Sequence, residues 1–130
     1  MPGPERATGT LFRVGVGLPL AIALWSAWTL APPGALFRLG DLLPHFAAFA
    51  YLTVALRLAW PALGHVSAVL WMCLLGAAIE LLQAAGGKRV ADWRDFAADL
   101  AGIAAGLAIH RLVGARVRRL VDRLVTAWLG

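Results

Sequence analysis

Acidic side chains are concentrated in residues 79–99, IELLQAAGGKRVADWRDFAAD. Four of the seven acidic residues of the chain lie here: Glu80, Asp92, Asp95 and Asp99. Asp41 is a fifth, and it lies with His45 in the upstream segment DLLPHF. Carboxylates and an imidazole transfer protons, bind hard or borderline metal ions and accept hydrogen bonds from ligands. Any of these uses requires structural elements that bring the two segments together.

The composition is that of a membrane protein. Only 15 % of the 130 residues are charged, against about 25 % in soluble domains, and the mean hydropathy is +0.76. The length allows one domain, residues 1–130. The net charge of +5 does not indicate nucleic-acid binding, because the basic residues flank apolar segments, as membrane orientation requires. Cys73 is the single cysteine, so no internal disulfide is expected.

Four apolar segments are long enough, or nearly so, to cross a membrane as helices. They cover residues 14–30, 43–60, 66–85 and 96–113, and a helical span takes roughly 20 residues. Proline and glycine residues follow the first three segments and predict turns. The first segment is longer than the core of a signal peptide, so we expect it to be retained. The sequence therefore predicts an all-α, integral membrane four-helix bundle.

The charges outside these segments predict the orientation of the chain. Residues 114–130 place apolar and basic side chains on opposite helical faces, which predicts an amphipathic interfacial helix on the cytoplasmic leaflet. With four spans both termini share one side. That side would carry eight of the twelve basic residues: Arg6, Arg13, Arg57, Arg111, Arg116, Arg118, Arg119 and Arg123. The positive-inside rule then predicts a multi-pass membrane protein with cytoplasmic termini.

This topology brings the polar segments to the outer end of the bundle. The second span starts there, the third ends there and the fourth starts there. Pairs of polar residues share one helical face at spacings of three or four, such as Asp95 and Asp99. Arg89 is the expected partner of Glu80, and Asp92 or Asp95 the expected helix cap. The predicted binding or structural cluster contains Asp41, His45, Glu80, Gln83, Arg89, Asp92, Asp95 and Asp99.

Small residues recur along the fourth span. Ala98, Gly102 and Gly106 follow one another at intervals of four residues. Such a pattern lets a second helix approach closely. The second helix could belong to the same chain or to another copy, so an oligomer is left open.

At the polar residues the chain resembles the VanZ-like family of small bacterial membrane proteins. The family pattern opens one span with Asp-Lys-x-x-His-Phe and closes the next with Glu-x-x-Gln. An Arg, a short loop and Asp-x-x-x-Asn followed by glycines complete it. The matching residues, in order, are Asp41, His45, Phe46, Glu80, Gln83, Arg89, Asp95, Gly102 and Gly106.

Three positions depart from the family pattern. Leu42 stands where a lysine is usual, Asp92 where a small hydroxyl residue is common, and Asp99 where asparagine is usual. These changes make the site more acidic and put in doubt any role of a lysine beside His45. The resemblance implies a multi-pass protein whose named member is linked to resistance to the glycopeptide teicoplanin. It implies no chemical reaction.

The residues leave several functions open. The first is binding of a membrane lipid, a lipid-linked wall precursor or a lipophilic glycopeptide, with Lys88, Arg89 and Arg94 available for a phosphate. A purely structural network that holds the helices together is an equal alternative. In all of these the protein is not an enzyme, and no cofactor or nucleic-acid partner is expected.

A membrane enzyme and a transporter are the remaining possibilities. An enzyme acting on a lipid-type substrate would use Asp41, His45, Glu80, Asp95 and Asp99, and a metal ion, if any, would be bound by the first four. No nucleophile lies in the cluster, because Ser26 and Ser67 are elsewhere. A small ion-coupled transporter would use Glu80 or Asp99 as the proton carrier.

Overall fold

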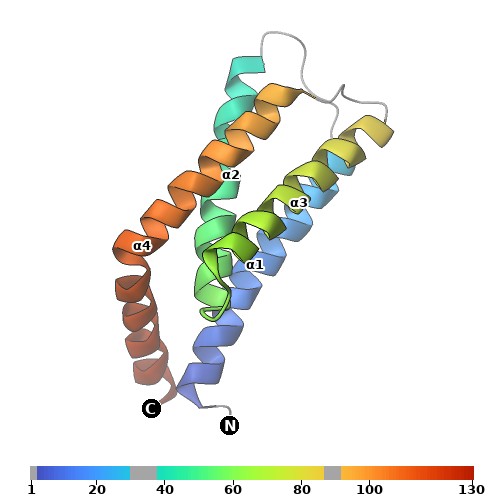
Figure 1. The fold of residues 1–130 in the computed structure, drawn as a ribbon. Coiled ribbons are helices and arrows are strands. Elements are labelled where there is room, and N and C mark those ends of the chain that lie inside the picture. The colour runs from blue at the N-terminus through green and yellow to red at the C-terminus, as the bar shows by residue number, and fades with distance from the viewer. Residues whose placement is uncertain (1–2, 30–37, 87–91) are drawn as a thin grey trace.

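The structure is a computed structural model that describes residues 3–29, 38–86 and 92–130, with side chains from 3–28, 42–86 and 92–130. The described residues form four helices and no strand: α1 (Pro4–Thr29), α2 (Arg38–Ala59), α3 (His65–Ala85) and α4 (Trp93–Leu129). Each helix is long and apolar enough to cross a membrane. The predicted all-α four-helix membrane fold is therefore confirmed (Figure 1).

Two helices extend far beyond the predicted apolar segments, and α2 also begins earlier, at Arg38 instead of residue 43. α1 begins at Pro4 instead of residue 14, because the polar residues before the apolar segment continue the helix. α4 runs without interruption to Leu129, so residues 114–129 form its second half and not a separate helix. Gly114 does not end α4, and Figure 1 shows this helix changing direction in its lower half. The amphipathic, interfacial role of this half stays a prediction.

The closest packing in the bundle joins α2 and α4. The two helices have far more contacts with each other than any other pair, and they run in the same direction in Figure 1. A Cβ atom added to Gly102 would lie 2.4 Å from the backbone oxygen of Phe46, and one added to Gly106 would lie 2.6 Å from that of Ala50. Since real Cβ atoms do not approach so closely, both glycines are required for this backbone contact.

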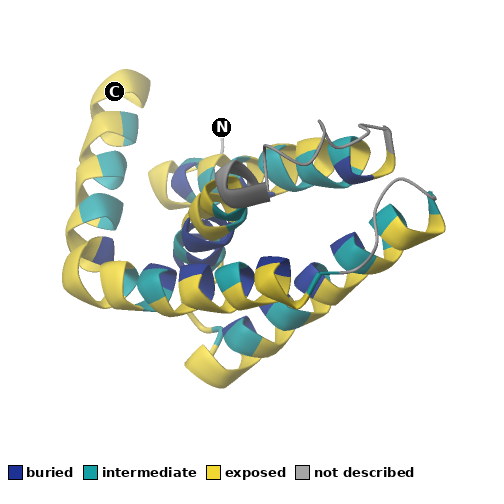
Figure 2. Ribbon diagram, turned by 90° about the horizontal axis from the view of Figure 1, so that it is seen from above, coloured by how far each residue is buried: buried dark blue, intermediate teal, exposed yellow. Residues whose placement is uncertain are grey.

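A small apolar core lies between the helices. Phe49 and Leu52 of α2 pack there with Met72 and Ile79 of α3 and Ile103 of α4. Large apolar side chains also cover the outside of all four helices, including Trp25, Leu81 and Leu112. Figure 2 shows the exposed residues on the outward surfaces and the buried ones toward the interior. This distribution fits helices surrounded by lipid.

Both ends of the described chain lie at the same end of the molecule (Figure 1). The start of α2, the end of α3 and the start of α4 lie at the opposite end. The end near the termini is the lower end of the molecule, and the opposite end is the upper end. The upper end is where the predicted polar cluster falls.

Candidate functional site

The centre of the candidate site is a hydrogen-bonded pair between α2 and α4. Nδ1 of His45 lies 2.9 Å from Oδ1 of Asp99. The Asp99 side chain is only 2 % exposed and that of His45 14 %. The pair forms because the close contact at Gly102 lies one turn below Asp99 on α4 and beside Phe46, the neighbour of His45 on α2.

Two more aspartates of α4 lie above Asp99. Asp95 occupies the same helical face one turn higher and is 1 % exposed. Asp92 precedes the helix and caps it, because its Oδ1 accepts a hydrogen bond of 3.0 Å from the backbone N–H of Arg94. Such a cap satisfies one of the backbone N–H groups that a helix start leaves without a partner. Asp92 thus orders the start of α4, while Asp95 and Asp99 point into the bundle.

α3 contributes Glu80 and Gln83 to the same region. The Glu80 carboxylate interacts electrostatically with Asp95, His45 and Asp99, and the backbone N–H of Asp92 donates a hydrogen bond to it. Oε1 of Gln83 is buried and has no partner among the described residues. The structure therefore brings side chains from α2, α3 and α4 together at the upper end.

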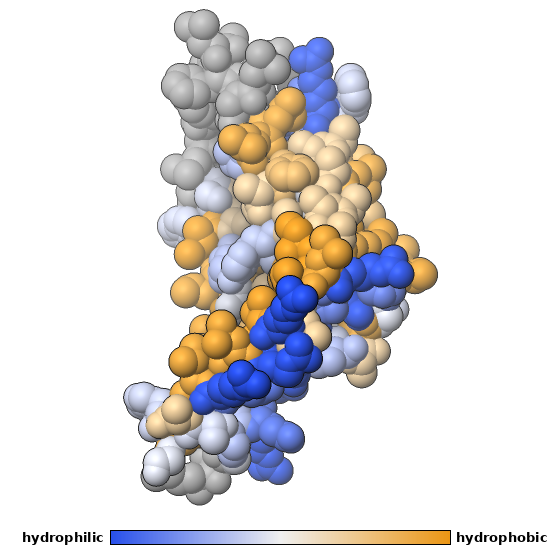
Figure 3. All heavy atoms as spheres, turned by 90° about the vertical axis from the view of Figure 1, so that its left-hand side faces the viewer, coloured by the Kyte–Doolittle hydropathy of each residue, from blue (hydrophilic) through white to orange (hydrophobic). Residues whose placement is uncertain are grey.

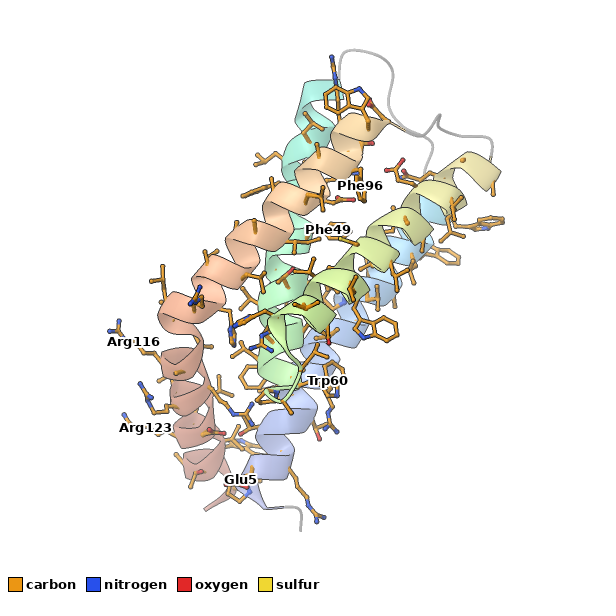
Figure 4. All side chains as sticks on the ribbon, in the orientation of Figure 1. Glu5, Phe49, Trp60, Phe96, Arg116 and Arg123 are labelled. Atoms are coloured by element: carbon orange, nitrogen blue, oxygen red, sulfur yellow. The ribbon has the colours of Figure 1, made fainter. Side chains whose placement is uncertain are left out.

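Phe49 and Gly76 close the cluster from below. A Cβ atom at Gly76 of α3 would lie 3.0 Å from Oδ2 of Asp99 and 3.6 Å from the Phe49 ring. Figure 4 shows Phe49 in the middle of the bundle, deeper than Phe96. The Phe49 side chain is 2 % exposed. The apolar Phe49 ring therefore borders the polar cluster from below in the described residues.

Two carboxylate oxygens of the cluster lack hydrogen-bond partners. Oδ2 of Asp99 and Oε1 of Glu80 are fully enclosed, and no described residue donates to either. A buried polar atom without a partner costs about 1–3 kcal/mol. Three carboxyl groups also lie beside one imidazole in a region of low dielectric, where unpartnered polar atoms are costly. The arrangement therefore favours groups that bring positive charge or hydrogen-bond donors.

Some predicted members of the cluster are placed only in part. Asp41 lies in the first turns of α2, but its side chain is outside the described residues, as are Lys88 and Arg89 altogether. Ala98 is half-buried on α4, one turn before Gly102. No three His, Cys, Asp or Glu side chains of the described residues are grouped so that they could hold a metal ion. The proposed ligand set of His45, Asp41, Glu80 and Asp95 includes one side chain that is not described.

Sequence reasoning missed a second polar group between the same two helices. Thr53 and Arg57 of α2 are buried toward the lower end of that helix, and His110 of α4 is half-buried, each with an enclosed nitrogen or oxygen atom that has no described partner. Arg57 was expected only as a charge that orients the chain. The spacing does contain a signal, since His110 follows Gly106 by four residues and so lies on the helical face that packs on α2.

Comparison with known proteins identifies the family. The sequence model of the family described as VanZ/LLP1 matches residues 11–114. Neither the curated proteins nor the solved structures include a significant match. The matched range contains all of α2 and α3, the cluster at the upper end and the two glycines of the α2–α4 contact. The chain therefore belongs to the VanZ-like family, and it is a multi-pass membrane protein of that family.

Proposed function

We propose that this protein acts at the cell envelope by binding an amphiphile whose head group donates hydrogen bonds to the cluster at the upper end. The observation that carries the proposal is the His45–Asp99 pair with an enclosed acceptor oxygen on either side, Oδ2 of Asp99 and Oε1 of Glu80. Hydrogen bonds to charged groups contribute about 1.5–3 kcal/mol each. A ligand with suitably placed donors would therefore gain affinity from both oxygens.

The chemistry of the cluster narrows the class of ligand. Lipid-linked wall precursors and lipophilic glycopeptides both carry sugar hydroxyls and amide N–H groups beside an apolar chain. Leu43 and Leu81 are large, exposed apolar residues on α2 and α3 at the level of the cluster, and they offer a surface for such a chain. Lys88 and Arg89, in the connection between α3 and α4, would supply cations for a phosphate.

The charge distribution supports an outer-leaflet location for this site. Basic residues accumulate toward the lower end: the halves of α1 and α4 next to the termini carry Arg6, Arg13, Arg116 and Arg123. Under the positive-inside rule that end faces the cytoplasm of a bacterial inner membrane. The cluster at the upper end would then face the outer leaflet, where wall precursors and glycopeptides meet the membrane.

An enzyme and an ion-coupled transporter would use the same carboxylates. A metal-dependent hydrolase needs a grouped ligand set, and the described residues do not contain one. A transporter needs a polar path, and Phe49 closes the described part of the cluster from below. No specific observation favours either alternative over binding.

Direct titration tests the proposal. The purified protein in lipid nanodiscs is titrated with teicoplanin and, separately, with a lipid-linked disaccharide-peptide precursor. Asp99→Asn and Glu80→Gln each replace an acceptor oxygen with a donating NH₂ group, so binding should weaken about tenfold or more, which corresponds to about 1.4 kcal/mol.

Asp122→Asn is the matched control. It removes a carboxylate from the same helix, about 34 Å further along the chain at 1.5 Å per residue, and should leave affinity within about twofold, well under the 1.4 kcal/mol of a tenfold change. If wild-type protein binds neither compound, or if both cluster variants bind like wild type, the proposal is wrong.

A further inference from the structure

A buried arginine near the lower end of α2 has no anionic partner among the described side chains. Arg57 is 9 % exposed, and its Nε and Nη1 atoms are enclosed without any hydrogen-bond acceptor from the described residues. A guanidinium group stays charged under all ordinary conditions. An enclosed charge without a partner is strongly unfavourable, because a low-dielectric interior does not replace its hydration.

The described groups near Arg57 can donate hydrogen bonds. His110 of α4 interacts electrostatically with Arg57 and with His65, the first residue of α3. Nδ1 of His110 and Oγ1 of Thr53, one turn above Arg57, are buried without a described partner. Arg118 of α4 reaches the same end of α2, where its Nη1 donates to the backbone oxygen of Leu58 at 2.8 Å.

Acidic side chains of the described residues do not neutralise this group. Neither Arg57 nor Arg118 forms an ion pair with a described aspartate or glutamate. The ion pair of His45 with Asp99 lies at the other end of the α2–α4 contact. The described side chains near the Arg57 guanidinium thus offer hydrogen-bond donors, and no described carboxylate forms an ion pair with it.

The position of Arg57 indicates the source of the missing anion. It lies in the last turn of α2, and Trp60, three residues later, is 40 % exposed. The Arg13 guanidinium lies 5.8 Å from the centre of the Trp60 ring. Tryptophan and arginine are typical of the depth at which lipid head groups lie. Figure 3 views the molecule from the side of α4 and shows hydrophilic side chains gathered in its lower part beside apolar ones.

We propose that Arg57, with His110, Thr53 and Arg118, binds the phosphate of an anionic phospholipid. Phosphate matches the fork of a guanidinium in geometry and charge. The surrounding apolar helix surface would hold the acyl chains. This site is separate from the cluster at the upper end and does not depend on the function proposed for that cluster.

Lipid binding to the delipidated protein tests this proposal. Wild-type protein in a neutral detergent is titrated with phosphatidylglycerol, with phosphatidylcholine and with inorganic phosphate. Binding is counted by native mass spectrometry and followed by the rise in thermal unfolding temperature. Phosphatidylglycerol should bind at least about tenfold more tightly than either of the others, a difference of about 1.4 kcal/mol.

Two variants locate the site. Arg57→Gln should remove most of the preference for phosphatidylglycerol, whereas Arg57→Lys should retain part of it, because the charge remains but the fork is lost. Arg116→Gln is the matched control, since Arg116 is exposed on α4 and points away from the bundle in Figure 4. It should change the affinity by less than about twofold, far below a tenfold change of 1.4 kcal/mol.

Each contrary result overturns the proposal. Equal binding of phosphatidylglycerol and phosphatidylcholine by wild type would show that no anion site exists, whatever the variants do. Inorganic phosphate binding as tightly as the lipid would exclude a lipid as the ligand. Folded Arg57→Gln protein could retain the preference for phosphatidylglycerol while Arg116→Gln protein loses it. That result would show that the lipid binds at the exposed surface of α4 and not at Arg57.

Discussion

The two ends of the α2–α4 contact enclose polar groups of opposite kind. At the upper end, Glu80, Asp95 and Asp99 supply acceptor oxygens around the single imidazole of His45. At the lower end, Arg57 supplies a cation, and His110 and Thr53 can donate hydrogen bonds. Both groups lie beside the same glycine contact, and both contain atoms without described partners.

The two ends differ in whether their polar side chains form hydrogen bonds with one another in the described residues. The upper end forms an internal pair between α2 and α4, and its remaining acceptors need donors. The lower end forms no such pair among the described residues, and the proposed lipid phosphate would supply an anion for its guanidinium. The same helix contact therefore presents two chemically opposite sites, and a single ligand class is not expected to suit both.

The glycine contact is common to both ends, and breaking it should have the largest effect. Gly102→Ala places a methyl group against the Phe46 backbone oxygen, which cannot move like a side chain. We expect a loss of about 3 kcal/mol or more, at the upper end of overpacking costs, and loss of ligand binding at both ends. Thermal unfolding in detergent and size-exclusion chromatography measure this.

Gly17→Ala is the control for that change. A Cβ atom at Gly17 of α1 meets nothing within 4 Å, so the substitution should be neutral or stabilising by up to about 1 kcal/mol. Equal stability of the two alanine variants would contradict the role of Gly102 in the α2–α4 contact.

Removal of His45 tests the internal pair of the upper end. His45→Leu leaves Oδ1 of Asp99 enclosed without its partner, so we expect a loss of about 2 kcal/mol. Combined with Asp99→Leu, the effect should be far from additive, because the second change removes the orphaned carboxylate. Unfolding of the four proteins of this double-mutant cycle gives the coupling energy. An additive result would show that the His45–Asp99 pair contributes nothing to the stability of the protein.

Removal of the buried polar side chain at the lower end should increase the stability of the protein instead of lowering it. Arg57→Met removes a buried donor group that has no partner in the described chain, so in neutral detergent we expect stabilisation of about 1–2 kcal/mol. Addition of phosphatidylglycerol should stabilise wild type more than the variant and so reduce or reverse the difference. Unfolding temperatures with and without the lipid measure this. Destabilisation in lipid-free detergent would contradict the contrast between the two ends.

The smallest effect is expected at the cap of α4. Asp92→Ala removes the acceptor for the Arg94 backbone N–H and should cost about 1 kcal/mol, while Asp92→Ser should cost almost nothing. Ligand binding should be unchanged in Asp92→Ser. A loss of binding in this variant would make Asp92 a member of the binding site and not only a cap.

Most of the fold follows from hydropathy and turn residues. The apolar segments set the number of helices, because hydrocarbon requires every backbone polar group to bond within its own helix. Hydropathy did not predict that α4 continues through Gly114. A Cβ atom at Gly114 would lie 2.7 Å from the His110 ring, so a glycine here leaves room for this side chain of the preceding turn. Gly114 therefore has a packing role within α4 and is not a helix end.

The candidate site was predictable only within each helix. Spacing placed Asp95 and Asp99 on one face, but which residue of α2 meets Asp99 depends on how closely Gly102 and Gly106 let the helices approach. Sequence reasoning paired Glu80 with Arg89, which lies outside the described residues. Arg57 was overlooked as a site because its burial arises from packing, and a single arginine at a helix end is usually exposed.

The glycine contact between α2 and α4 also determines how a ligand could reach the upper cluster. Where the backbones of two helices touch, no acyl chain or sugar passes between them, so that side of the cluster is shut. α3 has far fewer contacts with its neighbours, and one of its residues beside Asp99 is Gly76, which has no side chain. Lateral access from the membrane would therefore come past α3, and α3 would be the part of the bundle that moves.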